Sequence, residues 1–316
     1  MSNRYWIRPV ILILIGLACL CGHGCEPLIT ELITPQVTKM PTSTPTSVEA
    51  TPYPTVTATA TPMPATPTMQ PSPTATTEGE KVIITVVYDN NAYDPRLQTA
   101  WGFGCVVQRG ETTILFDTGG DGAILLSNMA ALGLDPHAMD IVVLSHIHGD
   151  HTGGLGDLLA TGVRPTIYVP ASFPARFKAQ VRAITTLQEV DKPQEILPSI
   201  YTTGQMGTGI AEQALVIETS QGLVVITGCA HPGVANMVRR AGQIGENGVY
   251  LVLGGFHLGG ASRSRIAGII ADFREMGVQK VAPCHCTGDQ AISMFATEYG
   301  DDFIENGVGK ILEIKP

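Results

Sequence analysis

The strongest structural signal in this 316-residue chain is the stretch Ser145–Gly154, which reads SHIHGDHTGG. It follows a short apolar run that predicts a buried strand, so we expect its histidines on a loop at a sheet edge. In extended backbone His146 and His148 would point to the same side. The next glycine lets Asp150 and His151 turn back toward them. Three imidazoles and a carboxylate this close together suit zinc, iron or manganese, so the stretch predicts a metal site.

Strand and helix signals alternate from Lys81 to the end of the chain. Helical spacing predicts one helix ending near Gly133 and a second that Ser262 caps and Gly277 ends. Hairpin signals occur early in this region and strand–helix units occur late, which indicates mixed α/β layers. The sequence contains no phosphate-binding glycine motif. Apolar and β-branched runs predict strands over residues 82–88, 113–116, 141–144, 215–218, 223–226 and 250–253, and a last strand from Val281.

The composition excludes several classes of protein. Apolar residues make up 44% of the chain, enough to bury a core, so a wholly disordered protein is excluded. Only one apolar run is long enough to consider as a membrane span, which excludes a polytopic membrane protein. The formal net charge of -9 argues against binding nucleic acid through its phosphates. No nucleic-acid partner is therefore expected.

Residues 1–25 have the order of an export signal. Arg4 and Arg8 precede an almost purely apolar run over residues 9–21, as in secretory signals. An uncleaved anchor is the alternative, although the run is shorter than the roughly 20 residues of a span. The run ends among three cysteines, Cys19, Cys21 and Cys25, and resembles the lipobox of bacterial lipoproteins. We expect an extracytoplasmic, lipid-anchored protein of the bacterial cell envelope, and which cysteine is acylated stays open.

Residues 26–80 predict a disordered linker. More than half of the positions from Thr34 to Glu78 are threonine or proline, which favours an extended, polyproline-II-like chain without a core. Such a spacer would hold the domain formed by residues 81–316 away from the membrane surface. A glycosylated stalk is the alternative.

The motifs of residues 81–316 resemble those of the metallo-β-lactamase superfamily. His146–His151 and the glycines after it match the H-x-H-x-D-H signature, and Asp117 in FDTG matches the early aspartate at a strand end. Four further segments narrow the resemblance to the dihydropterin-ribofuranosylaminobenzene phosphate synthase-like metallohydrolases. They are Ala100–Phe103, Thr227–Gly233, Gly254–Leu258 and Pro283–Gly288. The resemblance implies a four-layer αββα sandwich with two metal ions at the open edge between its sheets.

The ligands that the resemblance implies form two sets. They are His146, His148 and His231 for one ion and Asp150, His151 and His285 for the other. No histidine occurs between His151 and His231, so His231 takes the place of the ligand that most relatives carry in that interval. The cofactor expected is a pair of divalent ions, zinc first, with iron or manganese as alternatives.

Three more residues belong to the expected site. Cys229 stands where relatives carry a bridging aspartate; it would bridge as a thiolate or bind one soft metal, and a buried structural thiol is the alternative. His257 is a surplus imidazole that could be a ligand, a proton donor, a substrate-binding group or a structural residue. Asp117 is expected to orient a ligand histidine rather than to bind metal itself.

Two cysteines flank the last candidate ligand. In an extended strand Cys284 and Cys286 would both point to the opposite side from His285. With Cys105 and Cys229 they are the four cysteines of residues 81–316, and four cysteines do not define a disulfide pairing.

The expected chemistry is hydrolysis of a small molecule. Two cations roughly 3.5–4 Å apart would share a hydroxide whose pKa has fallen toward about 7. Asp150 would steer it, and His257 would protonate the leaving group. Residues 88–91 could line the pocket or simply form a turn. Trp101 and Phe103 could form an aromatic wall or simply pack in the core.

The substrate class stays open between related ester chemistries. We expect a hydrolase of phosphate esters, phosphodiesters or lactones. The alternatives are a pterin-condensing transferase, like the enzyme that names the group, and a non-catalytic metal-binding lipoprotein. A transferase of a cytosolic pathway fits an exported chain poorly, so the hydrolase is preferred.

Overall fold

The computed structural model describes residues 80–245 and 247–315, which belong to one compact unit. The predicted export signal, the lipobox-like cysteines and nearly all of the predicted linker lie outside the described residues. Among the described residues, no helix is both long and apolar enough to cross a membrane.

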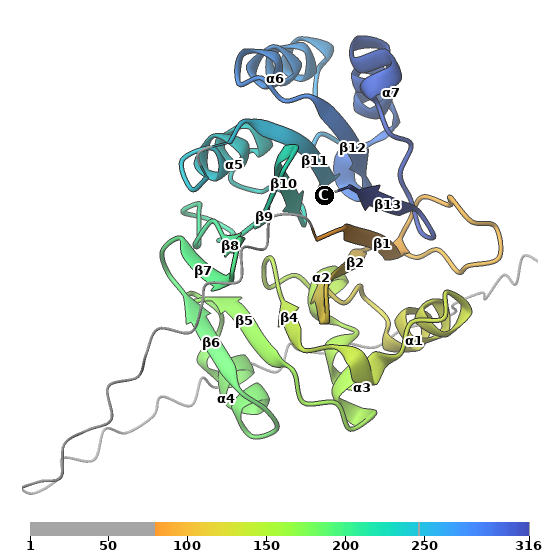
Figure 1. Ribbon diagram of the computed structural model, residues 1–316, viewed down its shortest axis with the longest axis vertical. Coiled ribbons are helices and arrows are strands. Elements are labelled where there is room, and N and C mark those ends of the chain that lie inside the picture. Colours follow the sequence, from red (N-terminus) through yellow and green to blue (C-terminus); the bar gives the residue numbers. More distant parts are fainter. Residues whose placement is uncertain (1–79, 246, 316) are drawn as a thin grey trace, which may run out of the picture. The chain divides into compact units, whose positions relative to one another are not determined.

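Two sheets form the centre of this unit (Figure 1). The first sheet has seven strands in the order β13-β1-β2-β3-β4-β5-β6, and the second has six in the order β12-β11-β10-β9-β8-β7. The first contains β1 (Val82–Asp89), β2 (Phe103–Arg109), β3 (Thr112–Phe116), β4 (Ile141–Val143), β5 (Thr166–Pro170), β6 (Leu187–Val190) and β13 (Ile311–Ile314). The second contains β7 (Gln194–Leu197), β8 (Ile200–Thr202), β9 (Leu215–Thr219), β10 (Gly222–Thr227), β11 (Val249–Gly255) and β12 (Lys280–Cys284).

Helices lie on the outer faces of the two sheets. In Figure 1, α5, α6 and α7 lie together at the top, beside the second sheet, while α1, α3 and α4 lie at the bottom. The helices are α1 (Gly122–Ala131), α2 (Gly149–Thr152), α3 (Leu155–Ala160), α4 (Ala175–Arg182), α5 (Val234–Ala241), α6 (Arg263–Glu275) and α7 (Asp289–Tyr299), with short 3₁₀ turns η1 (Pro136–Ala138), η2 (His285–Thr287) and η3 (Gly300–Asp302).

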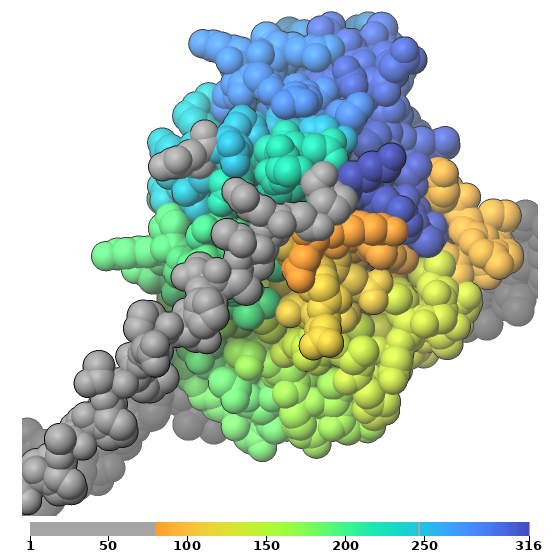
Figure 2. All heavy atoms as spheres, viewed as in Figure 1, coloured from red at the N-terminus to blue at the C-terminus, as the bar shows by residue number. Residues whose placement is uncertain are grey.

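Three apolar cores separate these layers. One core joins inner faces of both sheets, with Phe116 from the first and Leu253 from the second. Another packs the second sheet against α5–α7, where Phe273 and Phe295 lie edge to face. The third packs the first sheet against its own helices, around Leu125. The space-filling view shows the early, orange-to-green part of the chain below the later, teal-to-blue part (Figure 2). The mixed α/β prediction is thus confirmed.

The predicted local elements are present. Ser262 caps α6 by accepting a hydrogen bond from the Arg265 backbone, and Gly277 follows the helix in the left-handed conformation (φ 71°). Strands β9 and β10 form the predicted hairpin.

Strand direction determines where the functional residues lie. Strands β3 to β6 run parallel, as do β10 to β12. The carboxyl ends of parallel strands meet at one edge of a sheet, the usual place for binding sites in α/β proteins. Asp117 follows β3, the histidine loop follows β4, and Cys229, His257 and His285 follow β10, β11 and β12 in turn.

Candidate metal centre

The histidine loop supplies candidate ligands from the first sheet. His148 is the N-cap of the short helix α2, whose single turn carries Asp150 and His151. His146 and His151 are fully buried, while His148 and Asp150 are half-buried. The loop and the single helical turn that follows it therefore place four donor side chains in one region.

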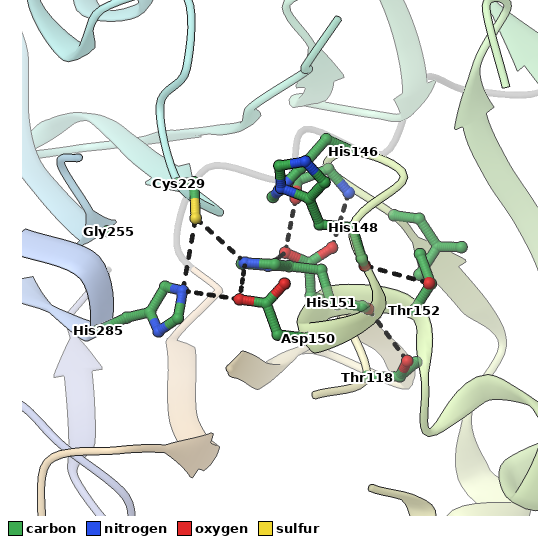
Figure 3. Close-up of polar contacts among 12 residues, drawn as sticks. Thr118, His146, His148, Asp150, His151, Thr152, Cys229, Gly255 and His285 are labelled. Atoms are coloured by element: carbon green, nitrogen blue, oxygen red, sulfur yellow. Dashed lines mark hydrogen bonds and ion pairs between the residues drawn. The ribbon is translucent and has the colours of Figure 1, made fainter. Parts of the chain in front are cut away.

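Four donor side chains from both sheets converge at one position (Figure 3). The Asp150 Oδ2 atom lies 3.5 Å from the His151 Nε2 atom and 3.4 Å from the His285 Nε2 atom. The Cys229 Sγ atom lies 3.2 Å from the same atom of His151 and 3.4 Å from that of His285. This position brings together Asp150, His151 and His285, the set expected for one ion, and adds Cys229.

A second position lies beside the first. The His146 Nε2 atom is 3.1 Å from the His148 Nδ1 atom, and the His231 ring lies 4.7 Å from the His146 ring and 4.8 Å from the His148 ring, centroid to centroid. Donor atoms of His146, His231 and Cys229 all lie within 4.8 Å of one another. Cys229 thus belongs to both groups, as a bridging ligand would.

Hydrogen bonds turn one nitrogen of each buried ring inward. The His151 Nδ1 atom is 2.7 Å from the Asp117 carboxylate, so this ring donates there and its Nε2 lone pair faces the site. The Ser145 hydroxyl lies 2.7 Å from Asp117 and 2.8 Å from the His146 Nδ1 atom. The His285 Nδ1 atom donates to the Asn90 side-chain oxygen at 2.8 Å. Such outer partners fix the tautomer that a metal-binding imidazole needs.

Glu212 is a functional residue that the sequence analysis missed. Its fully buried carboxylate accepts hydrogen bonds from the backbone of Cys229, Ala230 and His231, at 2.8–2.9 Å. It thereby holds in place the turn that carries two candidate ligands. No motif surrounds Glu212, and the loop that carries it contains other polar residues, so no sequence signal singles it out.

The site fits divalent cations. The His231 Nε2 atom is buried without a hydrogen-bond partner among the described residues, a costly state that a ligated ion would relieve. Burial lowers the pKa of His231 to about 4 and that of His146 still further, so both rings offer neutral nitrogens at neutral pH. Burial opposes protonation of His151, but the Asp117 carboxylate, to which its Nδ1 atom donates, outweighs burial and raises the pKa of that ring.

Backbone strain is concentrated around this centre. Five non-glycine residues of the described chain have positive φ, and four lie here: Asp117, Ala230, His257 and His285, at 51–61°. Such conformations cost about 1–3 kcal/mol each and persist at functional sites because the surrounding structure enforces them. Gly228 also has a specific role, since a side chain on it would collide with the Ser145 hydroxyl.

His257 and Cys286 lie at the outer side of the centre. The exposed ring of His257 is 4.3 Å from that of His231, centroid to centroid. The prediction for Cys286 was wrong: its Sγ atom lies 3.6 Å from the Cys229 carbonyl oxygen, next to the site. The reason is that His285 is left-handed and begins η2, so the strand does not continue past it. Cys284 is buried in the core between the sheets.

Two hollows flank the centre. One, of about 340 Å³, is lined by His231, His257 and Arg265 among others. The other, of about 220 Å³, lies beside His285 and Trp101. Trp101 is 61% exposed and its ring lies 4.9 Å from that of His285.

The structure distinguishes between the alternatives left open for three residues near the site. Tyr88, Asp89 and Phe103 are fully buried. Phe103 packs in the core between the sheets, because β2 turns its side chain inward. Asn90 and Asn91 do line the smaller hollow.

Comparisons with known proteins identify relatives of this chain. A family model described as the metallo-beta-lactamase superfamily matches residues 105–238. A 7,8-dihydropterin-6-methyl-4-(beta-D-ribofuranosyl)-aminobenzene-5'-phosphate synthase of Methanocaldococcus jannaschii is 31% identical over 246 residues, which are 63% of this chain and 84% of that protein. An uncharacterised protein of the same archaeon is 26% identical over 263 residues, covering 73% of this chain and all of that protein.

Solved structures give a similar result. Tm1679, described as a metal-dependent hydrolase of the beta-lactamase superfamily, is 27% identical with a TM-score of 0.62 and covers 74% of this chain and 100% of its own. The metallo-beta-lactamase fold protein YhfI from Bacillus subtilis, 17% identical with a TM-score of 0.57, covers 74% of this chain and 99% of its own and shares the fold.

Proposed function

Because the chain belongs to the metallo-β-lactamase superfamily, as its motifs predicted, we propose that it is a metal-dependent hydrolase of a phosphate ester, phosphodiester or lactone. The observation that carries this proposal is the convergence of donor atoms at two positions that share Cys229. The description of Tm1679 as a metal-dependent hydrolase supports it further.

Two divalent cations would be held by the residues of these two positions. Zinc suits the mixture of imidazole, carboxylate and thiolate donors, with iron or manganese as alternatives. One ion would be held by His146, His148 and His231 and the other by Asp150, His151 and His285, with Cys229 available to both. The cations supply Lewis acidity, which makes water a nucleophile near neutral pH and offsets charge on the ester oxygens.

Asp150 and His257 carry the proton chemistry in this proposal. Burial raises the pKa of Asp150, but its hydrogen bond to His285 and the nearby imidazoles outweigh this and lower the value to about 2. Its half-exposed carboxylate is therefore charged and can orient a water molecule by accepting a hydrogen bond. A hydrogen bond with Cys286 raises the pKa of His257, so this exposed ring, at the edge of the larger hollow, can donate a proton to a leaving group.

A second candidate function is supported by the relative with 31% identity, which is a synthase. A group transfer would use the same centre to join two molecules, with a second substrate in place of water. Product analysis separates the two reactions, because only hydrolysis incorporates solvent oxygen into a product. Turnover that needs a second organic substrate would replace the hydrolase proposal.

We also propose that the chain is exported and lipid-anchored at the bacterial cell envelope. The support lies in the sequence of residues 1–25 alone. Intact mass of the protein extracted from membranes, compared with Cys19→Ala, Cys21→Ala and Cys25→Ala variants, would identify an acylated cysteine. An unmodified protein that fractionates with the cytosol would contradict this part of the proposal.

Elemental analysis and a substrate panel test the enzyme proposal together. We expect two divalent ions per chain and turnover of at least one nitrophenyl phosphodiester or lactone. His148→Ala should lose turnover while the fold is retained. His137→Ala is the matched control, because His137 is exposed in η1, outside the candidate metal groups. If the protein binds metal but turns over no ester, by hydrolysis or by group transfer, it is instead a non-catalytic metal-binding protein.

A further inference from the structure

We propose that Cys229, His257 and Cys286 form an additional metal site, which takes a thiophilic divalent cation such as Zn²⁺ or Cd²⁺ on the outer side of the candidate centre. One donor atom from each residue lies within 4.8 Å of the other two. Cys229 is shared with the candidate centre, whereas neither ligand set described above uses Cys286 and no metal is assigned to His257.

The site is built from three successive strand ends of the second sheet. Cys229 follows β10, His257 follows β11, and Cys286 lies in η2 directly after β12. Left-handed backbone at His257 and at His285 turns the chain so that these side chains meet. Gly255 leaves the space that they need, since a side chain on it would come within 2.7 Å of the Cys286 Sγ atom.

The donor set determines the kind of cation. Two sulfurs and one imidazole nitrogen are a typical zinc set, and soft thiolates favour zinc-like and softer metals over magnesium or calcium. Both sulfurs are buried whereas His257 is exposed. A cation here would therefore have three protein ligands and one position open to solvent.

A cation at this site changes the role of His257. A ring that binds metal through its free nitrogen cannot at the same time donate a proton from that nitrogen. Excess thiophilic metal should therefore inhibit turnover. This consequence rests on the proposed function, whereas the binding site itself does not.

Cadmium titration of the full chain tests the site directly. Bound cadmium is counted by elemental analysis after removal of free metal, in wild type and in three variants. Cys286→Ala and His257→Asn should each bind one fewer cadmium ion than wild type; asparagine tolerates the positive φ at position 257. Cys105→Ala is the control, since it removes a buried core thiol that belongs to no candidate metal group. Every variant retains Cys19, Cys21 and Cys25, so any cadmium that these cysteines bind is the same in all samples and does not affect the comparison.

The outcomes separate this proposal from the enzymatic one. Equal cadmium content in wild type, Cys286→Ala and His257→Asn would overturn the additional site, as would a Cys229–Cys286 disulfide in the isolated protein. Loss of one ion in those two variants would support it even if no substrate is ever found. If turnover is observed, excess Zn²⁺ should inhibit wild type and Cys105→Ala and leave Cys286→Ala uninhibited.

Discussion

The first sheet presents its candidate ligands on one continuous loop, whereas the second sheet presents each of its ligand-bearing turns at a separate strand end. His146, His148, Asp150 and His151 lie within a single turn after β4. Cys229 and His231, His257 and His285 come from the ends of β10, β11 and β12. The two sheets face each other across this centre, so its assembly depends on the packing between them.

We call the ligands from the first sheet the first half of the centre and those from the second sheet the second half. The two halves are stabilised in different ways. In the first, one buried carboxylate, Asp117, holds His151 directly and His146 through Ser145. In the second, Glu212 holds the 229–231 turn, and Asn90 from the first sheet holds His285. Three of the four strained residues of the centre lie in the second half. The first half is thus one connected network, whereas the second is a set of separately supported turns.

The largest effect should come from removing a ligand of the connected loop. His151→Ala deletes a donor of the four-residue position and leaves the Asp117 carboxylate buried without that partner. We expect loss of bound metal and a fall in turnover of more than about 100-fold, beyond what an orienting residue causes. Metal content by elemental analysis and kcat/KM check this. A variant that keeps full metal content and turnover would break the proposed ligand set.

A smaller effect should follow from changing the residues that orient the rings. Asp117→Asn weakens the hydrogen bond that holds His151 and disturbs Ser145, so metal affinity should fall by about 10- to 100-fold. Asn90→Ala affects only His285 and should lie near the lower end of that range. Competition with a chromophoric chelator measures both affinities. If Asn90→Ala lowers metal affinity more than Asp117→Asn does, the ligands of the first half are not the more strongly connected set.

The loop of the first half could be predicted from the sequence because its information is local. The spacing of His146, His148 and His151 and the apolar run before them contain both the donors and their placement. The Ser262 cap and the hairpin of β9 and β10 are local in the same sense. Strands β2, β5, β6, β7, β8 and β13 were not predicted. In β6 and β7 several positions are polar and exposed, which weakens the strand pattern.

The second half could be predicted only in part, because its information is not local. A resemblance singled out His231 and His285, but nothing near Glu212 in the sequence indicates its role. That role arises from backbone hydrogen bonds across 17 to 19 positions. The left-handed conformation of His285 also cannot be seen in an apolar pattern, and it reverses the predicted direction of Cys286.

Glu212, which supports the second half, should make the free energy of unfolding of the protein depend on pH. Burial raises the pKa of this carboxyl from 4.5 to about 7. Between those values the native state binds more protons than the unfolded state, so the free energy of unfolding of the metal-free protein should fall as pH rises, by up to about 3 kcal/mol. Glu212→Gln should lose this slope. Urea unfolding of chelator-treated protein across this range measures it. The exposed Glu305→Gln variant should retain the wild-type slope; an equal slope in Glu212→Gln would contradict the assignment.

The smallest effect is expected at Trp101, where the two halves meet. This side chain precedes β2 of the first sheet, lies against His285 of the second, and lines the smaller hollow. Because its ring is 61% exposed, Trp101→Ala should barely change the free energy of unfolding. A stacking contact with an aryl ester would be lost, so KM for that substrate should rise by up to about 10-fold. Tyr93→Ala removes another exposed aromatic ring, one that lies beside Lys310, and should leave KM unchanged. An unchanged KM in Trp101→Ala would assign substrate binding to the larger hollow, beside His231 and His257, and so to the second half alone.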